Sequence, residues 1–73
     1  MNPPANVTLS GRELDVLNLL AKGLTKTEIA KVLEISPNTV DGHVKNLYAK
    51  LGVRNGPEAV YEAFMTGYLK VPK

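Results

Sequence analysis

Two helix-start signals follow one another closely within residues 24–50, and they constrain this chain more than any other feature. Thr25 and Glu28 have the T-x-x-E spacing of a capping box, in which the threonine oxygen accepts from a backbone amide and the glutamate reaches back to the cap. Ser36 and Pro37 form the second signal, because serine caps a helix and proline fits the first helical position. The sequence therefore predicts a short helix, a tight connection and a longer helix.

The apolar residues of this stretch have helical spacing, which predicts helices over residues 26–33 and 37–51. Two such helices joined by so short a link pack at a steep angle, and this defines a helix-turn-helix motif at about residues 24–43. The usual function of the motif is DNA binding, with the second helix in the major groove. The two expected apolar faces consist of Ile29, Ala30 and Leu33 on the first helix and Val40, Val44, Leu47 and Leu51 on the second.

Two further helices flank the motif. Ser10 begins an S-x-x-E capping box that predicts a helix over residues 10–22, and Asn55 begins an N-x-x-E start that predicts a helix over residues 57–66. No segment of the chain alternates with the period of a strand. We therefore predict an all-α fold, a four-helix bundle that contains the helix-turn-helix.

The length and composition limit what else the chain can be. Seventy-three residues make one small domain, which gains from oligomerisation or from a parent chain. The chain has no cysteine for disulfides or thiolate metal sites, and its apolar runs are too short to span a bilayer. Because the N-terminus lacks the order of a signal peptide, we expect a cytoplasmic protein with no membrane partner. We expect a linker remnant or flexible arm over residues 1–7, the domain over 8–70 and a tail over 71–73.

The positive charge is concentrated on the predicted motif. The formal net charge is +2, and both flanking segments are neutral, so the whole excess lies in the middle of the chain. This placement favours an anionic partner at the helix-turn-helix. The charged residues concerned are Lys26, Lys31, Lys45, Lys50 and Arg54 against Glu28, Glu34 and Asp41.

Catalytic and metal chemistry find little support in the sequence. His43 is the only histidine, and with no cysteine it has no companions for a metal site. Four short helices also leave little volume for a pocket that could hold a nucleophile and its base. We therefore expect no enzymatic activity, no cofactor and no metal.

The last helix is more apolar than one buried face requires. A first stripe contains Val60, Ala63, Phe64 and Gly67, and a second lies about 100° round the helix axis. The second stripe is either the seam of a homodimer, weak in the isolated domain, or additional core of a small domain. Its members are Tyr61, Met65 and Tyr68.

Core, cap and turn residues of the predicted helices occur together in one register. They are Leu9, Ser10, Arg12, Glu13, Val16, Leu17, Leu20, Ala21, Gly23, Leu24, Glu28, Ile29, Ala30, Leu33, Ile35, Ser36, Thr39, Val40, His43, Lys50, Leu51, Gly52, Val53 and Ala59. Over about residues 8–70 these residues resemble the LuxR-type (FixJ/GerE-like) helix-turn-helix domain. The resemblance implies a four-helix domain of a bacterial transcription regulator, an N-terminal sensory or receiver domain in the parent chain, and dimerisation through the last helix. It also implies that His43 is a structural hydrogen bonder, and RNA polymerase is a further candidate partner.

The candidate DNA contacts come from two sources. The resemblance implies contacts to bases and backbone from Asn38, Thr39, Asp41, Gly42, Lys45 and Asn46. Helix N-termini bind phosphate, and the two N-termini of the motif would use Thr25, Lys26, Thr27 and Ser36. Lys50 joins Lys45 as a candidate phosphate ligand on the expected outward side of the second helix.

Asp41, Gly42 and Gly56 depart from the family pattern, and the position of Asp41 is often basic there. These departures favour an alternative function, a protein-interaction module with weak or lost DNA binding. A third candidate function is the promoter-contacting end of a sigma-like factor, which shares the helix-turn-helix motif. Asp41 could instead accept from a cytosine amino group while Gly42 allows close approach of the backbone. The favoured interpretation is that both residues are tolerated because lysines and helix N-termini already hold the phosphates.

Overall fold

The computed structural model describes residues 8–69, which form four α-helices and no strand, so the predicted all-α class is confirmed. The expected linker 1–7 and tail 71–73 lie outside the described residues. Two predicted ranges were off by one residue, because Ser10 and Lys22 are caps of the first helix and Gly56 is already helical in the last. The helices are α1 (Gly11–Ala21), α2 (Lys26–Leu33), α3 (Pro37–Leu51) and α4 (Gly56–Thr66).

Each helix begins at the side chain that the sequence indicates. In α1, the Ser10 Oγ accepts from the Glu13 amide at 3.1 Å, and the Ser10 amide donates to the Glu13 carboxylate at 2.8 Å. The same reciprocal pair occurs at the start of α2, where Thr25 caps the helix. The Asn55 Oδ1 accepts from the Glu58 amide at 2.9 Å and begins α4. These caps satisfy amides that a helix leaves without partners in its first turn.

The turn between α2 and α3 is tight because of a left-handed residue that the sequence did not indicate. Glu34 has φ +58° and ψ +43°, the one non-glycine residue with positive φ in the described part of the chain. The Ile35 amide then donates to the Ala30 carbonyl at 3.0 Å, which closes the end of α2. Ile35 packs against the core, and this contact offsets the cost of the left-handed conformation.

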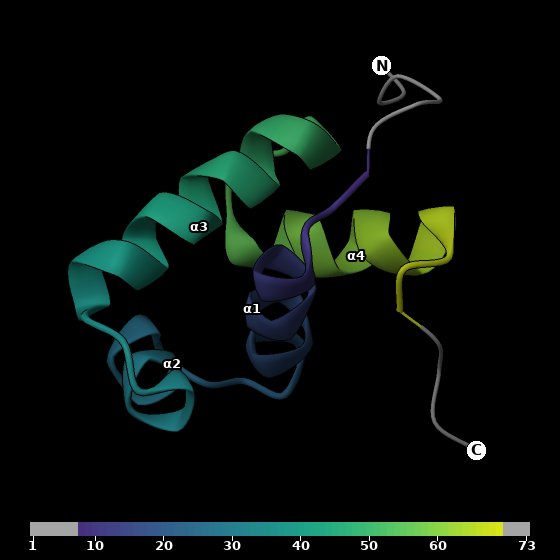
Figure 1. Ribbon diagram of the computed structural model, residues 1–73. Coiled ribbons are helices and arrows are strands. Elements are labelled where there is room, and N and C mark those ends of the chain that lie inside the picture. Colours follow the sequence, from purple (N-terminus) through teal and green to yellow (C-terminus); the bar gives the residue numbers. More distant parts are fainter. Residues whose placement is uncertain (1–7, 70–73) are drawn as a thin grey trace.

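The helices pack so that α1 and α3 organise the domain. Each of these two contacts all three other helices, whereas α2 contacts only α1 and α3 among the described elements. Figure 1 shows α2 beside the N-terminal end of α3, well away from the far end of α4. The helix-turn-helix therefore packs against α1 through both of its helices, while α4, among the described helices, packs against α1 and α3 only.

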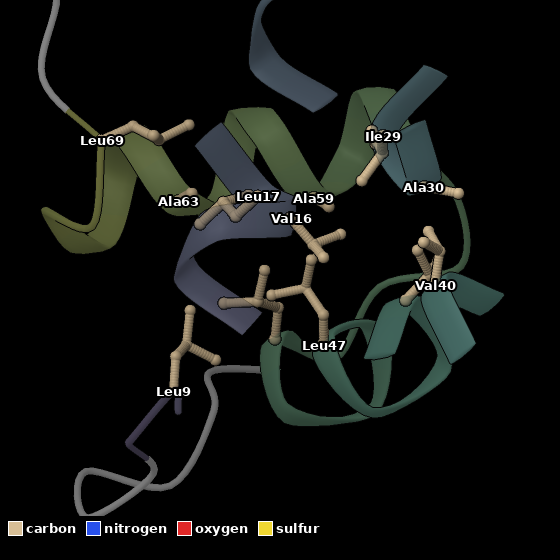
Figure 2. Packing of buried hydrophobic residues seen from close by; sticks show 12 residues of the cluster. Leu9, Val16, Leu17, Ile29, Ala30, Val40, Leu47, Ala59, Ala63 and Leu69 are labelled. Carbon is tan, nitrogen blue, oxygen red and sulfur yellow. The ribbon is translucent and has the colours of Figure 1, made fainter. Parts of the chain in front are cut away.

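The core lies where the apolar faces of the helices meet (Figure 2). Leu17, Ile29 and Leu47 are fully buried, from α1, α2 and α3 respectively, and α4 contributes the small residues Ala59 and Ala63. The predicted apolar face of α3 is confirmed, because all four of its members are buried. None of the four described helices is long and hydrophobic enough to cross a membrane.

Candidate nucleic-acid interface

Helix α3 has two different faces, and the bundle covers only one of them. The covered face carries Val40, Val44, Leu47 and Leu51, which are at most 2% exposed. The opposite face is polar and open to solvent. Along that face lie exposed Asn38, Thr39, Gly42, Lys45 and Asn46.

The structure brings the predicted contact residues together on one surface, apart from Lys50. Thr25, Lys26 and Thr27 are exposed at the start of α2, and Ser36 is exposed at the start of α3. The Ser36 Oγ accepts from the Thr39 amide at 3.1 Å and lies 2.8 Å from the Thr39 hydroxyl. Ser36 therefore has a structural task at the helix start, and its neighbours present the open face.

A carboxylate on α3 joins two of the predicted phosphate ligands. The Lys26 Nζ donates to Asp41 Oδ1 at 2.7 Å, and the Lys45 Nζ lies 3.2 Å from Asp41 Oδ2. The first contact crosses from α2 to α3, so the N-terminus of α2 sits beside the exposed face of α3. We call Lys26, Asp41 and Lys45 the acidic bridge.

Within the acidic bridge, Asp41 and Lys26 each stabilise the charged form of the other. The hydrogen bond from Lys26, followed by that from Lys45, holds the pKa of the Asp41 carboxyl below its ordinary value. The hydrogen bond to Asp41 likewise raises the pKa of Lys26. Asp41 is therefore ionised and Lys26 is protonated at neutral pH. Two lysines against one aspartate give the bridge a formal net charge of one positive charge.

Lys50 does not lie on the open face as the sequence suggested. Its Nζ donates to the Glu13 carboxylate at 2.7 Å and to the Thr8 carbonyl at 3.1 Å, so it points toward α1. The Glu13 side chain is only 6% exposed and therefore needs a cation as partner. In this structure Lys50 holds α1 to the C-terminal end of α3 and is not offered to a phosphate.

Opposing effects set the pKa of the Glu13 carboxyl. Burial acts to raise it, but the hydrogen bond from Lys50 and the backbone hydrogen bond from Ser10 outweigh burial, and the pKa lies below its ordinary value. Glu13 is thus an ionised, buried group that serves both the cap of α1 and the contact with α3.

His43 and Tyr48 are half-buried ring side chains on α3. His43 is half-buried, and its structural hydrogen bond stays a prediction. Among residues 8–69, which the structure describes, no cluster of histidine, aspartate and glutamate is arranged to hold a metal ion. Tyr48 is half-buried and packs against the core.

Helix α4 carries the largest exposed apolar side chains of the described chain. Tyr61 is 65% exposed, Met65 is 67% exposed and Phe64 is 37% exposed. Tyr68, which the sequence grouped with Tyr61 and Met65, is half-buried and packs against the core. Phe64 takes its place, since residues 61, 64 and 65 share one side of a helix. We call Tyr61, Phe64 and Met65 the α4 patch.

A short helix, a tight turn and a longer helix with one open polar face define the helix-turn-helix class of domains. The chain is a member of the bacterial regulatory proteins of the LuxR family, whose sequence pattern matches residues 7–63. The family that the sequence suggested is thereby confirmed.

Known proteins are similar to this chain in both sequence and fold. The chain is 55% identical over 47 residues to the nitrate/nitrite response regulator protein NarP of Escherichia coli. The matched region covers 64% of this chain and 22% of NarP. The transcription factor GerE has a TM-score of 0.78 at 35% identity, covering 85% of this chain and 92% of GerE. The VqmA–ligand–DNA complex of Vibrio cholera has a TM-score of 0.80 at 32% identity, covering 89% of this chain and 29% of VqmA. NarP is a response regulator and GerE a transcription factor, which agrees with the prediction that this domain is not an enzyme.

Proposed function

We propose that this domain binds double-stranded DNA in a sequence-specific way for transcription regulation, with α3 in the major groove. The observation that carries the proposal is the open polar face of α3, with the N-terminus of α2 held beside it by the 2.7 Å contact between Lys26 and Asp41. Side chains on such a face reach base edges, while helix N-termini and lysines contact phosphates. The complex of VqmA with DNA supports the same partner here.

Within this proposal the contacts divide by position. Thr39, Lys45 and Asn46 on α3 contact bases or nearby phosphates, and Asn38 and Gly42 line the same face. Thr25, Lys26 and Thr27 approach the backbone at the start of α2. Ser36 acts mainly by fixing the start of α3, because its hydroxyl is engaged with Thr39. Lys50 is left out of the interface because it is bound to Glu13.

Replacing Lys45 with alanine is expected to weaken DNA binding and to flatten its salt dependence. Lys45 is 77% exposed and has spare donors beyond its contact with Asp41. Each phosphate that a lysine neutralises contributes about 0.9 to the slope of log affinity against log salt. Fluorescence anisotropy on a labelled duplex over a range of salt concentrations measures both quantities.

Lys31→Ala is the matched control, since it removes the same charge from an exposed position near the end of α2. Equal slopes and affinities for the two variants would remove Lys45 from the interface. Failure of the unaltered domain to retain any duplex at low salt would refute DNA binding itself. That outcome would favour the alternative, a protein-interaction module, for which the pairing of both lysines with Asp41 is the motivating observation.

The α4 patch supports a second element of the proposal, pairing of two copies on DNA. Two half-sites read by one protein require two recognition helices about 34 Å apart, which a two-fold dimer provides. Tyr61 and Met65 offer exposed apolar area for the contact. Two copies of a three-residue patch are nevertheless expected to bury less than the roughly 1,200 Å² of a stable interface. We therefore expect the free domain to be monomeric at micromolar concentration, which sedimentation tests.

Met65→Glu is expected to reduce cooperative occupation of a duplex with two half-sites, because it places a charge in the apolar seam. The affinity for a single half-site and the helical circular dichroism should stay nearly unchanged, since Met65 is 67% exposed. Met65→Leu preserves the apolar surface and should retain the cooperativity. A loss of fold in the glutamate variant would instead place Met65 in the core and refute the seam.

The chain spans only 22% of the length of NarP, so the remaining partners are inferred for a longer protein. We infer that residues 8–70 form the output domain of a regulator whose N-terminal sensory or receiver domain brings two copies together. RNA polymerase is the candidate partner once the protein is on DNA. A protein that acts on bacterial DNA works in the cytoplasm.

A further inference from the structure

Asp41 is the acidic residue of the open face, and its carboxylate is shared between two helices. One oxygen accepts from Lys26 of α2 at 2.7 Å, and the other lies 3.2 Å from Lys45 of α3. The side chain is 37% exposed, so it still faces outward from the bundle. The acidic bridge therefore fixes a carboxylate on the surface that would meet DNA.

The bridge leaves this carboxylate able to accept further hydrogen bonds. An ionised carboxylate offers about four acceptor positions, and the two lysines occupy one on each oxygen. The two ammonium groups also outweigh its charge, so the bridge as a whole carries one positive charge. An unpaired aspartate would be repelled by phosphates, whereas this one is brought toward DNA with its charge compensated.

In the major groove, one base suits a group such as the Asp41 carboxylate, which can only accept hydrogen bonds. Cytosine shows its N4 amino donor there, and carboxylates accept from it. Guanine and thymine present acceptor oxygens, and adenine places an acceptor nitrogen beside its amino group. Gly42 follows Asp41 in the chain, and a side-chain carbon built at Gly42 would meet no atom within 4 Å. Position 42 therefore has no side chain beside the carboxylate, and the space there is open.

We propose that Asp41 is a specificity-determining residue that accepts from the amino group of a cytosine in the major groove while Lys26 and Lys45 compensate its charge. The proposal rests on the proposed function, because it requires α3 to enter the groove. It replaces the expectation that Asp41 is merely tolerated with an assigned role. It also predicts that the same residue lowers affinity for DNA without the cytosine, because both lysines are held by the carboxylate.

The experiment selects binding sites for the domain and for Asp41→Ala from a pool of duplexes with randomised sequence. The unaltered domain is expected to enrich a C·G pair at one position of each half-site, and Asp41→Ala is expected to lose that preference while keeping the others. On a selected duplex, replacing this C·G pair with T·A should weaken the unaltered domain at least about fivefold, the lower end for a good base contact. The alanine variant should change less than about twofold.

A second readout uses a duplex of unrelated sequence. Asp41→Ala releases Lys26 and Lys45, so its affinity for this duplex should rise roughly two- to fivefold, as for one exposed ion pair. The matched control is Asp15→Ala, which changes the net charge equally but removes an exposed partner of Arg12 on α1 at 3.5 Å. Asp15→Ala should keep the selected cytosine.

The outcomes separate this inference from the function on which it rests. If both proteins select the same C·G position, or the unaltered domain selects none that depends on residue 41, the role of Asp41 is refuted while DNA binding stands. If no duplex from the pool is retained at low salt, the proposed function fails and the inference fails with it. If Asp41→Ala gains no more affinity for unrelated DNA than Asp15→Ala does, the acidic bridge does not lower the affinity of the unaltered domain for such DNA.

Discussion

Replacing Lys50 with methionine should lower the free energy of unfolding by about 2–3 kcal/mol, because it leaves a buried carboxylate without its cation. Glu13 is 6% exposed on its side chain, and Lys50 lies 2.7 Å away. The Ser10 amide would remain as its hydrogen-bond donor, which limits the loss. A domain of this length has a total stability of roughly 4–11 kcal/mol, so the variant would be close to marginal. Urea unfolding followed by far-UV circular dichroism measures the change.

The pH dependence identifies Glu13 as the cause. Because the pKa of Glu13 is held below its ordinary value of 4.5 in the folded protein, its stabilisation is present above that pH and is lost as the pH falls through the folded pKa. Without Lys50, only the hydrogen bonds with Ser10 oppose the effect of burial, so the pKa of Glu13 should be higher than in the unaltered protein and its charged form should cost more. The difference between the two proteins should therefore narrow from about pH 7 to about pH 3.

Lys45→Met provides the matched comparison on the same helix. Lys45 is 77% exposed, and Asp41 keeps Lys26 as a partner, so the unfolding midpoint should hardly move. If Lys50→Met were as mild as Lys45→Met, or if its deficit persisted unchanged in acid, Lys50 and Glu13 would not form the stabilising pair that the structure shows.

The helix starts could be predicted because each depends on a few neighbouring residues. Ser10 and Glu13 are three positions apart and exchange hydrogen bonds as soon as one turn forms. Thr25 and Glu28 repeat this arrangement. The periodic apolar face of α3 was equally visible, because its burial requires only that some partner cover it. Local chemistry thus accounts for most of the fold.

The turn and the long-range ion pair could not be predicted in the same way. Glu34 adopts a left-handed conformation that usually belongs to glycine or asparagine, and the hydrogen bond and core packing of the following Ile35 stabilise it. Lys50 and Glu13 are far apart in sequence, and each had a plausible local role, one as a phosphate ligand and the other as part of a cap. Their pairing becomes visible only when α1 and α3 pack together.

Counting basic residues therefore overstated the free positive charge of the candidate interface. Lys50 is bound to Glu13, and Lys26 and Lys45 share Asp41. The sequence placed the excess charge in the correct part of the chain but gave no information about these partners. Tyr68, just after α4, was also misplaced by the sequence. Its spacing predicted an exposed apolar stripe with Tyr61 and Met65, but its side chain packs against the core. Phe64 was recoverable from the sequence, because it shares a helical side with Tyr61.

Ile29→Ala should have the largest effect of any change in the helix-turn-helix, lowering the free energy of unfolding by about 2–5 kcal/mol. Ile29 is fully buried, and α2 has only eight residues with Ile29 and Ala30 as its buried members. Helices this short are not stable alone, so tertiary packing must hold α2 in place. Ile29 is the largest fully buried side chain of α2 and lies within the core cluster (Figure 2).

Because α2 contacts α1 and α3 but not α4, the loss of Ile29 should loosen α2 first. Amide hydrogen exchange should then show protection falling in α2 more than in α1 and α3, and DNA affinity should fall as Lys26 loses its place beside Asp41. Val32→Ala is the internal comparison, since Val32 belongs to the same helix but is 56% exposed, and its effect should stay within about 0.5 kcal/mol. Equal stability for the two variants would show that Ile29 does not dock α2. Uniform loss of protection in all four helices would show instead that the helix-turn-helix unfolds only together with the whole domain.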